Sequence, residues 1–219
     1  MAGARTGWLL NMQSIKLGIQ EIFMLRLFQT LLFSIFLTQI AFAAELTPTL
    51  DGESFTNQFV GKQPNGDKLL EFVRPTESFN NWTKLVGYRY QQLPALSNDP
   101  MKYALAMERL VKQTNPQAAV KISRNEQSGE AIVDFLTWPQ DQSYMELNVF
   151  RFWKSKDGNA VVSVQLANKF VAPKPERSQN GANEYQRKLN EVRERRQNWI
   201  KQVADISIVA IEEQLVNLR

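Results

Sequence analysis

The chain has 219 residues and a formal net charge of +4, and it contains neither histidine nor cysteine. The absence of histidine excludes Ser-His-Asp and Cys-His nucleophile systems. With neither residue type present, ordinary zinc, copper and non-haem iron sites are not expected, and no cofactor is indicated. The two signs of charge are too nearly balanced to indicate a nucleic-acid partner.

An apolar run over residues 27–40 follows Arg26 and leads into the small residues Ala41, Ala43 and Ala44. A cation, an apolar core and an A-x-A exit are typical of a secretory signal peptide, here cut after Ala43. Polar residues interrupt the run, which is shorter than the about 20 apolar residues of a membrane span. Cleavage is therefore favoured over a retained anchor or a buried helix. We expect a periplasmic or secreted protein that meets the membrane only transiently.

The segment before this leader has an unusual length. Residues 1–23 are too long for a normal charged region and carry Glu21, whereas Met24 begins a conventional leader by itself. We therefore predict that residues 1–23 are an over-extended N-terminus and that residues 24–43 are the signal peptide. The remaining 176 residues, with a net charge of about +2, suit one domain plus a terminal appendage.

The predicted domain spans residues 44–171 and begins with a loose polar lead-in over 44–54. Residues 55–62 and 68–74 are predicted strands, joined by a turn at Asn65-Gly66, because both positions of such a turn tolerate positive φ. Further along, Ser78 is placed to cap a short helix over 79–86. The apolar side of that helix would consist of Phe79, Trp82 and Val86.

Two further elements precede the main sheet. Tyr88 and Tyr90 lie at strand spacing and predict a short strand after the first helix. Asp99-Pro100 opens a clear helix over 99–114, since Asp caps first-turn amides and Pro is favoured at the first helical position. Its predicted buried stripe recurs at spacings of 3 and 4 and consists of Tyr103, Ala104, Met107, Leu110 and Val111.

Alternating apolar residues then predict strands at 118–122, 131–135, 145–153 and 160–166. Short turns such as Asp157-Gly158 join these strands, so that neighbours run antiparallel. The sequence therefore predicts an α+β fold, with an antiparallel sheet of about six strands. The predicted helices at 79–86, at 99–114 and at the C-terminus would cover the sheet.

Residues 172–182 are rich in Pro and Gly and predict a linker before a long helix over 183–219. A heptad-like seam along that helix consists of Tyr185, Leu189, Val192, Arg196, Trp199 and Val203. One interpretation is a helix that meets a partner helix. The favoured alternative is an amphipathic helix packed on its own sheet, because further apolar residues at Ile200, Ile208, Val209 and Ile211 widen the stripe.

Asp134 and Glu146 are the strongest catalytic candidates in the domain. They lie on neighbouring predicted strands and can face each other, and a carboxylate pair can carry acid–base chemistry. Solvent-facing positions on a half-exposed sheet are the favoured interpretation. The sequence contains no glycine-rich phosphate loop and no D-x-D-x-D-G calcium loop.

Two other groups of side chains are candidates for binding. Aromatic residues gather on the predicted sheet, where they would either form the core, as we favour, or contact a ligand: Trp138, Tyr144, Phe150, Phe152 and Trp153. Basic residues gather on the terminal helix among several glutamates: Arg187, Lys188, Arg193, Arg195, Arg196 and Lys201. We interpret most of the basic group as a solvated, ion-paired face, with contact to anionic lipid or to an acidic partner as the alternative.

Short motifs resemble those of uncharacterised exported proteins of gram-negative bacteria over most of residues 55–204. The motifs are Glu71-Phe72-Val73-Arg74-Pro75, Asn81-Trp82-Thr83 and Arg195-Arg196-Gln197-Asn198-Trp199-Ile200. The order of elements is also similar to the PsbP/Mog1-like α/β sandwich. Because such proteins are mostly accessory or binding factors, the resemblance implies a non-catalytic role and transfers no site residues.

Taken together, the sequence predicts a non-enzymatic periplasmic protein that binds a protein partner or an apolar ligand, as an accessory part of an envelope assembly. A second hypothesis is a carboxylate-dependent hydrolase that acts on envelope glycans. The predicted partner lies in the cell envelope, and the candidate partner surface is the seam from Tyr185 to Val203.

Overall fold

The computed structural model describes residues 47–171 and 179–218. The predicted signal peptide, residues 1–23 and residues 172–178 of the predicted linker lie outside these ranges. The strands are β1 (Thr49–Leu50), β2 (Glu53–Ser54), β3 (Asn57–Lys62), β4 (Lys68–Val73), β5 (Lys84–Gln91), β6 (Val120–Arg124), β7 (Ala131–Thr137), β8 (Met145–Lys154) and β9 (Val161–Phe170). The helices are the short 3-10 turn η1 (Pro94–Leu96), α2 (Pro100–Thr114), α3 (Gln179–Asp205) and α4 (Ile208–Val216).

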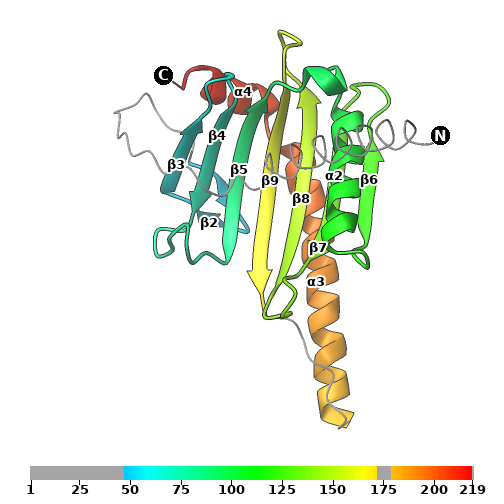
Figure 1. Ribbon diagram of the computed structural model, residues 1–219. Helices are drawn as coiled ribbons and strands as arrows, with labels where there is room; N and C mark the ends of the chain where they lie inside the picture. The colour runs from blue at the N-terminus through cyan, green and yellow to red at the C-terminus, as the bar shows by residue number, and fades with distance from the viewer. Residues whose placement is uncertain (1–46, 172–178, 219) are drawn as a thin grey trace, which may run out of the picture. The chain divides into compact units, whose positions relative to one another are not determined.

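One sheet of seven strands, in the order β3-β4-β5-β9-β8-β7-β6, carries the fold (Figure 1). Every neighbouring pair is antiparallel, which confirms the predicted α+β class, with seven strands rather than about six. The chain builds two meanders, β3 to β5 and β6 to β9. They join in the middle, where β5 pairs with β9 from Lys84↔Asn168 to Gln91↔Val161.

The two strongest local predictions are confirmed. The Asn65-Gly66 turn connects β3 to β4, with Gly66 at φ +92° and Asn65 Oδ1 accepting from the Asp67 amide at 3.1 Å. Helix α2 begins where expected, because the Asp99 carboxylate accepts from the Lys102 amide at 2.9 Å and Pro100 occupies the first turn.

Helices cover the two faces of the sheet unequally. We call the face under α2 the front face and the face under α3 and α4 the back face (Figure 1). The front core joins α2 to β7, β8 and β9 and consists of Ala104, Met107, Val111, Ala118, Ala131, Val133, Phe135, Phe150, Phe152 and Val161. The back core extends from β4 to β8 under α3 and α4 and includes Phe55, Leu70, Phe72, Leu147, Val149, Trp153, Leu166, Trp199, Val203, Ile211 and Leu215.

The helix predicted at 79–86 is absent, and β5 begins inside its range at Lys84. Ser78 does not cap a helix but forms an isolated bridge with Asn81. Phe79 and Trp82 pack from this loop onto a small cluster at one end of the front face, so their spacing of three reflects a loop. The lead-in predicted over 44–54 also contains structure, since β1 and β2 pair in a small hairpin.

The predicted single helix over 183–219 is two helices. Helix α3 already begins at Gln179, inside the predicted linker, and it ends at Asp205. Ser207 then caps α4 by accepting from the Ala210 amide at 3.5 Å. The break allows the short α4 to pack against β4 and β5, beside the strands that α3 covers.

Candidate functional site

The seam predicted on the terminal helix divides into two parts with different surroundings. We call residues 195–205 of α3 the docked segment and residues 182–194 the projecting segment. In the docked segment, Trp199 and Val203 are fully buried in the back core. In the projecting segment, Tyr185, Leu189 and Val192 are partly exposed, and most of their neighbours are exposed. Figure 1 shows this part of α3 extending beyond the end of the sheet.

Polar contacts fix the docked segment in place. Trp199 Nε1 donates to Asp51 Oδ1 at 3.0 Å, and Arg195 donates to Asn168 Oδ1 at 2.8 Å. Arg196, the one cation in the seam, pairs with the buried carboxylate of Asp134 on β7. This part of the seam therefore follows the interpretation of an amphipathic helix packed on its own sheet.

The side-chain hydrogen bonds described for the projecting segment stay within the helix. Arg187 bridges Glu184 and Glu191, and Arg193 donates to Asn190 at 3.0 Å. These are exposed contacts one turn apart, and exposed contacts of this kind contribute little to stability. Among the described residues, the hydrogen bonds of this segment are therefore made within its own helix and not to the sheet.

The charges around this stripe are not distributed evenly. At 3.6 residues per turn, Lys188 lies beside the stripe on one edge and Arg193 on the other. The carboxylates of Glu184, Glu191 and Glu194 lie farther round the helix. Glu184 and Glu191 pair with Arg187, and Glu184 also lies 3.4 Å from Lys188 Nζ. The stripe is therefore apolar in the middle and cationic at both edges.

Asp134 and Glu146 do not form a catalytic pair. Asp134 lies opposite Val149 on the back face, whereas Glu146 alternates with Leu147 and points to the front face. Asp134 is also buried and paired, so the interpretation of a solvent-facing position is wrong for this residue. A carboxylate-dependent hydrolase would need a different pair of residues.

The aromatic concentration is mainly core, as favoured. Phe150, Phe152 and Trp153 are buried on the two faces of β8. Tyr144 is exposed, and its ring lies 5.4 Å from Lys169 Nζ, which also stands 3.8 Å above the ring of Trp82. An aromatic platform on an open sheet is therefore absent from the described front and back faces.

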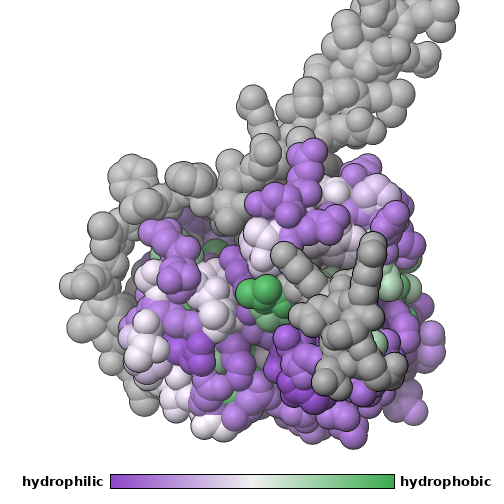
Figure 2. All heavy atoms as spheres, turned by 90° about the horizontal axis from the view of Figure 1, so that it is seen from below, coloured by the Kyte–Doolittle hydropathy of each residue, from purple (hydrophilic) through white to green (hydrophobic). Residues whose placement is uncertain are grey.

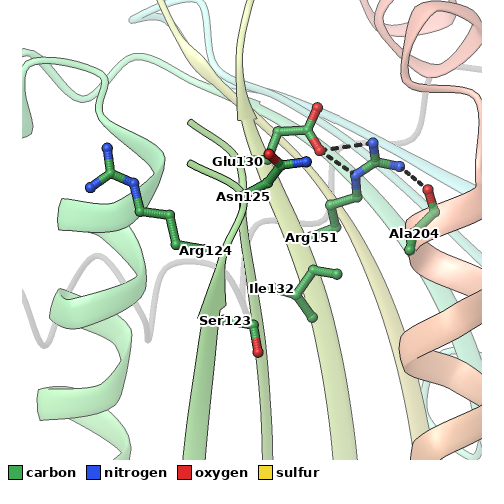
Figure 3. A pocket seen from close by; sticks show the side chains of 7 residues that line it. All are labelled: Ser123, Arg124, Asn125, Glu130, Ile132, Arg151 and Ala204. Atoms are coloured by element: carbon green, nitrogen blue, oxygen red, sulfur yellow. Dashed lines mark hydrogen bonds and ion pairs between the residues drawn. The ribbon is translucent and has the colours of Figure 1, made fainter. Parts of the chain in front are cut away.

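A hollow of about 220 Å³ lies beside the end of α3 (Figure 3). Arg151 lines this hollow, and its Nε and Nη2 donate to Glu130 Oε2 at 2.9 and 2.8 Å. Arg151 Nη1 reaches three carbonyls at the end of α3, those of Val203, Ala204 and Ile206, at 2.8–3.0 Å. A cation at a helix C-terminus satisfies its carbonyls and complements its dipole. Because the guanidinium of Arg151 is already bonded to Glu130 and to the end of α3, we interpret this hollow as a contact that joins α3 to the sheet and not as a binding site.

Sequence reasoning missed a polar group on the front face. Arg89 on β5 donates to Glu71 on β4 at 3.0 Å, and Gln165 on β9 donates to Asn148 on β8 at 2.7 Å. These side chains surround Gly87, which lies directly opposite Gln165 in the β5–β9 register. The available signal was a glycine in the middle of an otherwise strong strand.

Other site types find no support in the described ranges. No group of three or more potential metal ligands occurs among residues 47–171 and 179–218. None of the helices in the same ranges has both the length and the apolar content required to cross a bilayer.

The chain belongs to an uncharacterised protein family, whose model matches residues 47–208. The match begins just before β1 and ends at the start of α4, so it covers the sheet, α2 and α3. Comparison with curated proteins gives no match.

Proposed function

We propose that the protein is a non-enzymatic periplasmic or secreted factor that binds a protein partner through the projecting segment of α3. The partner surface is an acidic amphipathic helix of another envelope protein, so that this chain serves as an accessory part of an envelope assembly. The observation that carries the proposal is the partly exposed stripe of Tyr185, Leu189 and Val192, beyond the end of the sheet.

Charge selects the kind of partner. In a helix pair, the residues beside an apolar seam face the corresponding residues of the partner helix. Lys188 and Arg193 occupy those positions here, and both are exposed. A second copy of the chain would place cations against cations, which costs free energy, whereas glutamates or aspartates on a partner would pair with them.

An apolar small molecule fits the same surface less well. Figure 2 views the molecule from the end at which α3 projects, and the described surface there is mainly hydrophilic, with green confined to small patches. An apolar ligand requires a concave site that buries most of its surface. A narrow stripe between cations instead matches the helix-in-groove mode of protein recognition.

The proposed location follows from the N-terminal sequence. The apolar run over residues 27–40 and the small residues around Ala43 support export and cleavage. N-terminal sequencing of the protein from its native envelope tests this directly. A mature chain that begins at Ala44 is expected, and a chain that retains residues 24–43 would contradict the cleaved form.

Site-specific photo-crosslinking in the native cell tests the partner surface. A photoreactive residue replaces Leu189 in the stripe or, as a control, Glu194 on the opposite side of the helix. We expect a discrete adduct from position 189 and none from position 194. The combined charge reversal Lys188→Glu and Arg193→Glu should abolish the adduct, whereas Arg187→Glu, away from the stripe, should preserve it.

Three outcomes would contradict the proposal. Equal adducts from positions 189 and 194 would indicate non-specific contact. An adduct with a second copy of the chain would indicate self-association, and an adduct insensitive to charge reversal would remove the acidic partner. Absence of any adduct at position 189, with the labelled protein folded and exported, would contradict binding through this segment.

A further inference from the structure

Strand β3 lies at one outer edge of the sheet, where β4 is its neighbour on the inner side (Figure 1). The ladder between the two strands runs without interruption from Asn57↔Val73 to Lys62↔Lys68. On its outer side, β3 pairs with no strand of the part of the chain that the structure describes. An open edge of this kind is a template to which a further strand can be added.

The turn after β3 shows which backbone groups face the open side. Gln63 N donates to Asp67 O at 2.9 Å, and these two residues are directly opposite when the register of β3 and β4 is continued. In an antiparallel ladder, hydrogen-bonded pairs alternate with pairs whose N–H and C=O groups point outward. Counting back along β3 from this hydrogen-bonded pair, the residues whose backbone groups point outward are Lys62, Val60 and Gln58.

These outward groups are available for pairing. Val60 is 37% exposed, and Lys62 is exposed as well. Among residues 47–171 and 179–218, no turn or loop hydrogen bond uses the backbone of Gln58, Val60 or Lys62. Proteins commonly protect such an edge with several charged side chains, with proline or with a bulge. In β3 the only charged residue is Lys62, at the end of the strand, and there is no proline.

The other outer strand, β6, is protected in this way. It is five residues long, and its side chains at Lys121 and Arg124 are exposed and lie on opposite faces of the sheet. Charged side chains on both faces discourage the addition of another strand. The two edges of the same sheet therefore differ, and β3 is the one suited to pairing.

We propose that β3 pairs with β3 of a second copy of this chain, antiparallel and about a two-fold axis beside Val60. In this register Val60 lies opposite Val60 of the second copy, and Gln58 lies opposite Lys62 of the second copy. Moving the axis by one residue would leave the outward groups of one of these residues unpaired, and an axis at Lys62 would place lysine opposite lysine. The contact uses the same patch on both copies, so it closes as a dimer.

The side chains on the back face agree with this register. Val60 lies opposite Leu70, a residue of the back core, so its exposed side chain is on the back face. In the dimer the two Val60 side chains would meet, and apolar cross-strand pairs stabilise a sheet. The Gln58 carboxamide oxygen would accept from the Lys62 ammonium of the second copy. No cation would then face a cation across the new edge.

Gly61 supports the same register, because its own chain does not require glycine there. Gly61 has no positive φ, and a β-carbon would make only ordinary contacts with Leu69 and Phe59, at 3.4 Å. Glycine within a strand is unfavourable, and it often marks the close approach of another group. In the proposed pair that group is Phe59 of the second copy, which lies directly opposite Gly61 and can cover its bare backbone.

Strand β3 and the projecting segment of α3 are different surfaces, so the dimer and the proposed partner do not compete for the same residues. Sedimentation of the mature chain over a range of concentrations measures the association. The unaltered chain should form a reversible dimer. Val60→Lys places two lysines against each other at the axis and should raise the dissociation constant of the dimer at least about tenfold.

Ser123→Lys is the matched control. It adds the same charge at an exposed position of the other outer strand, β6, and it should leave the dissociation constant of the dimer unchanged. Because Val60 and Ser123 are both exposed, both variants should keep the stability of the unaltered chain. Urea denaturation of the two variants checks that they are folded.

Single cysteines test the register, since the chain has no cysteine of its own. In the proposed pair, the Cα atoms of the two residues 60 lie about 5.5 Å apart, which a disulfide can span. The Cα atoms of the two residues 62 lie about 15 Å apart, which is too far. With oxidised glutathione as the oxidant, Val60→Cys should form a covalent dimer and Lys62→Cys should not.

A chain that stays monomeric at every concentration would overturn the proposal, as would a dimer that Val60→Lys leaves unchanged. Equal cross-linking of Val60→Cys and Lys62→Cys would exclude the proposed register. A dimer that is weakened by Ser123→Lys and not by Val60→Lys would place the contact at β6 and would also overturn the proposal.

Discussion

The two segments of α3 share one apolar periodicity but differ in what lies beneath it. In the docked segment, Trp199 and Val203 are fully buried against the sheet. In the projecting segment, Leu189 and Val192 continue the same seam and stay partly exposed. A heptad pattern therefore defines the apolar side of a helix without defining what covers that side. The docked segment stabilises the fold, and the projecting segment is the surface we assign to a partner.

Trp199→Ala should have the largest effect on stability. The side chain is fully buried, and its Nε1 donates to Asp51. Truncating a buried Trp typically costs about 3–5 kcal/mol. Urea denaturation should show this loss, whereas Leu189→Ala in the projecting segment should change the free energy of unfolding by no more than about 0.5 kcal/mol. Equal losses for the two variants would remove the distinction between the segments.

The Asp134–Arg196 pair should give the next largest effect. Arg196→Met leaves the Asp134 carboxylate buried without its cation, since Asp134 is 4% exposed. We expect a loss of about 1–3 kcal/mol, and a smaller loss when Asp134→Asn is added, because the uncompensated charge is then removed. Chemical denaturation of both single variants and the double variant measures the coupling. Strictly additive losses would show that the pair does not hold the docked segment.

Ser207→Ala tests the end of the docked segment. The Ser207 hydroxyl caps α4, and loss of such a cap typically costs about 1 kcal/mol. A thermal melt should show a correspondingly lower midpoint. Ser207→Asp, which retains a capping oxygen, should restore most of the loss. If both variants matched the unaltered protein, the break between α3 and α4 would not depend on this cap.

Acid should weaken the docked segment through Asp51. Burial alone would raise the pKa of Asp51, but hydrogen bonds from Lys84, Trp199 and Gln202 outweigh it and lower the pKa from its ordinary value of 3.8. A carboxylate with a lowered folded pKa stabilises the protein above its ordinary pKa, and this contribution is lost as the pH falls through the folded value.

Free energies of unfolding, measured for the unaltered protein and for Asp51→Asn between about pH 5 and pH 2.5, should therefore converge at the acid end. Asparagine suits the test because Asp51 has a φ of 54°, a left-handed conformation that asparagine tolerates well. A constant difference across this range would mean that Asp51 does not contribute through its charge.

Much of the fold could be predicted from local signals. Asn65-Gly66 and Asp99-Pro100 are turn and cap sequences whose conformations are set by adjacent residues, and the structure confirms both. The helix predicted at 79–86 failed because the spacing of Phe79 and Trp82 comes from a loop that packs over the sheet. The conformation of residues 79–86 therefore depends on long-range packing, which a sequence pattern does not show.

The candidate site likewise has a part that local spacing predicts and a part that depends on contacts between distant residues. The seam of α3 could be found from its spacing, but the partner of Arg196 is Asp134, 62 residues away in the sequence. The polar group around Gly87 joins residues of β5 and β9 that only the sheet register brings together. Neither contact has a local signal stronger than a cation in an apolar seam or a glycine in a strand.

Amide hydrogen exchange along α3 of the isolated mature protein measures directly how far the two segments differ. Amides of residues 199–205 should exchange only with global unfolding, because the docked segment is buried in the back core. Amides of residues 182–194 should exchange orders of magnitude faster, because that segment has only its own helix to protect it. Equal, near-global protection of both segments would rule out the projecting segment as a free partner surface, since it would then already be covered within the protein.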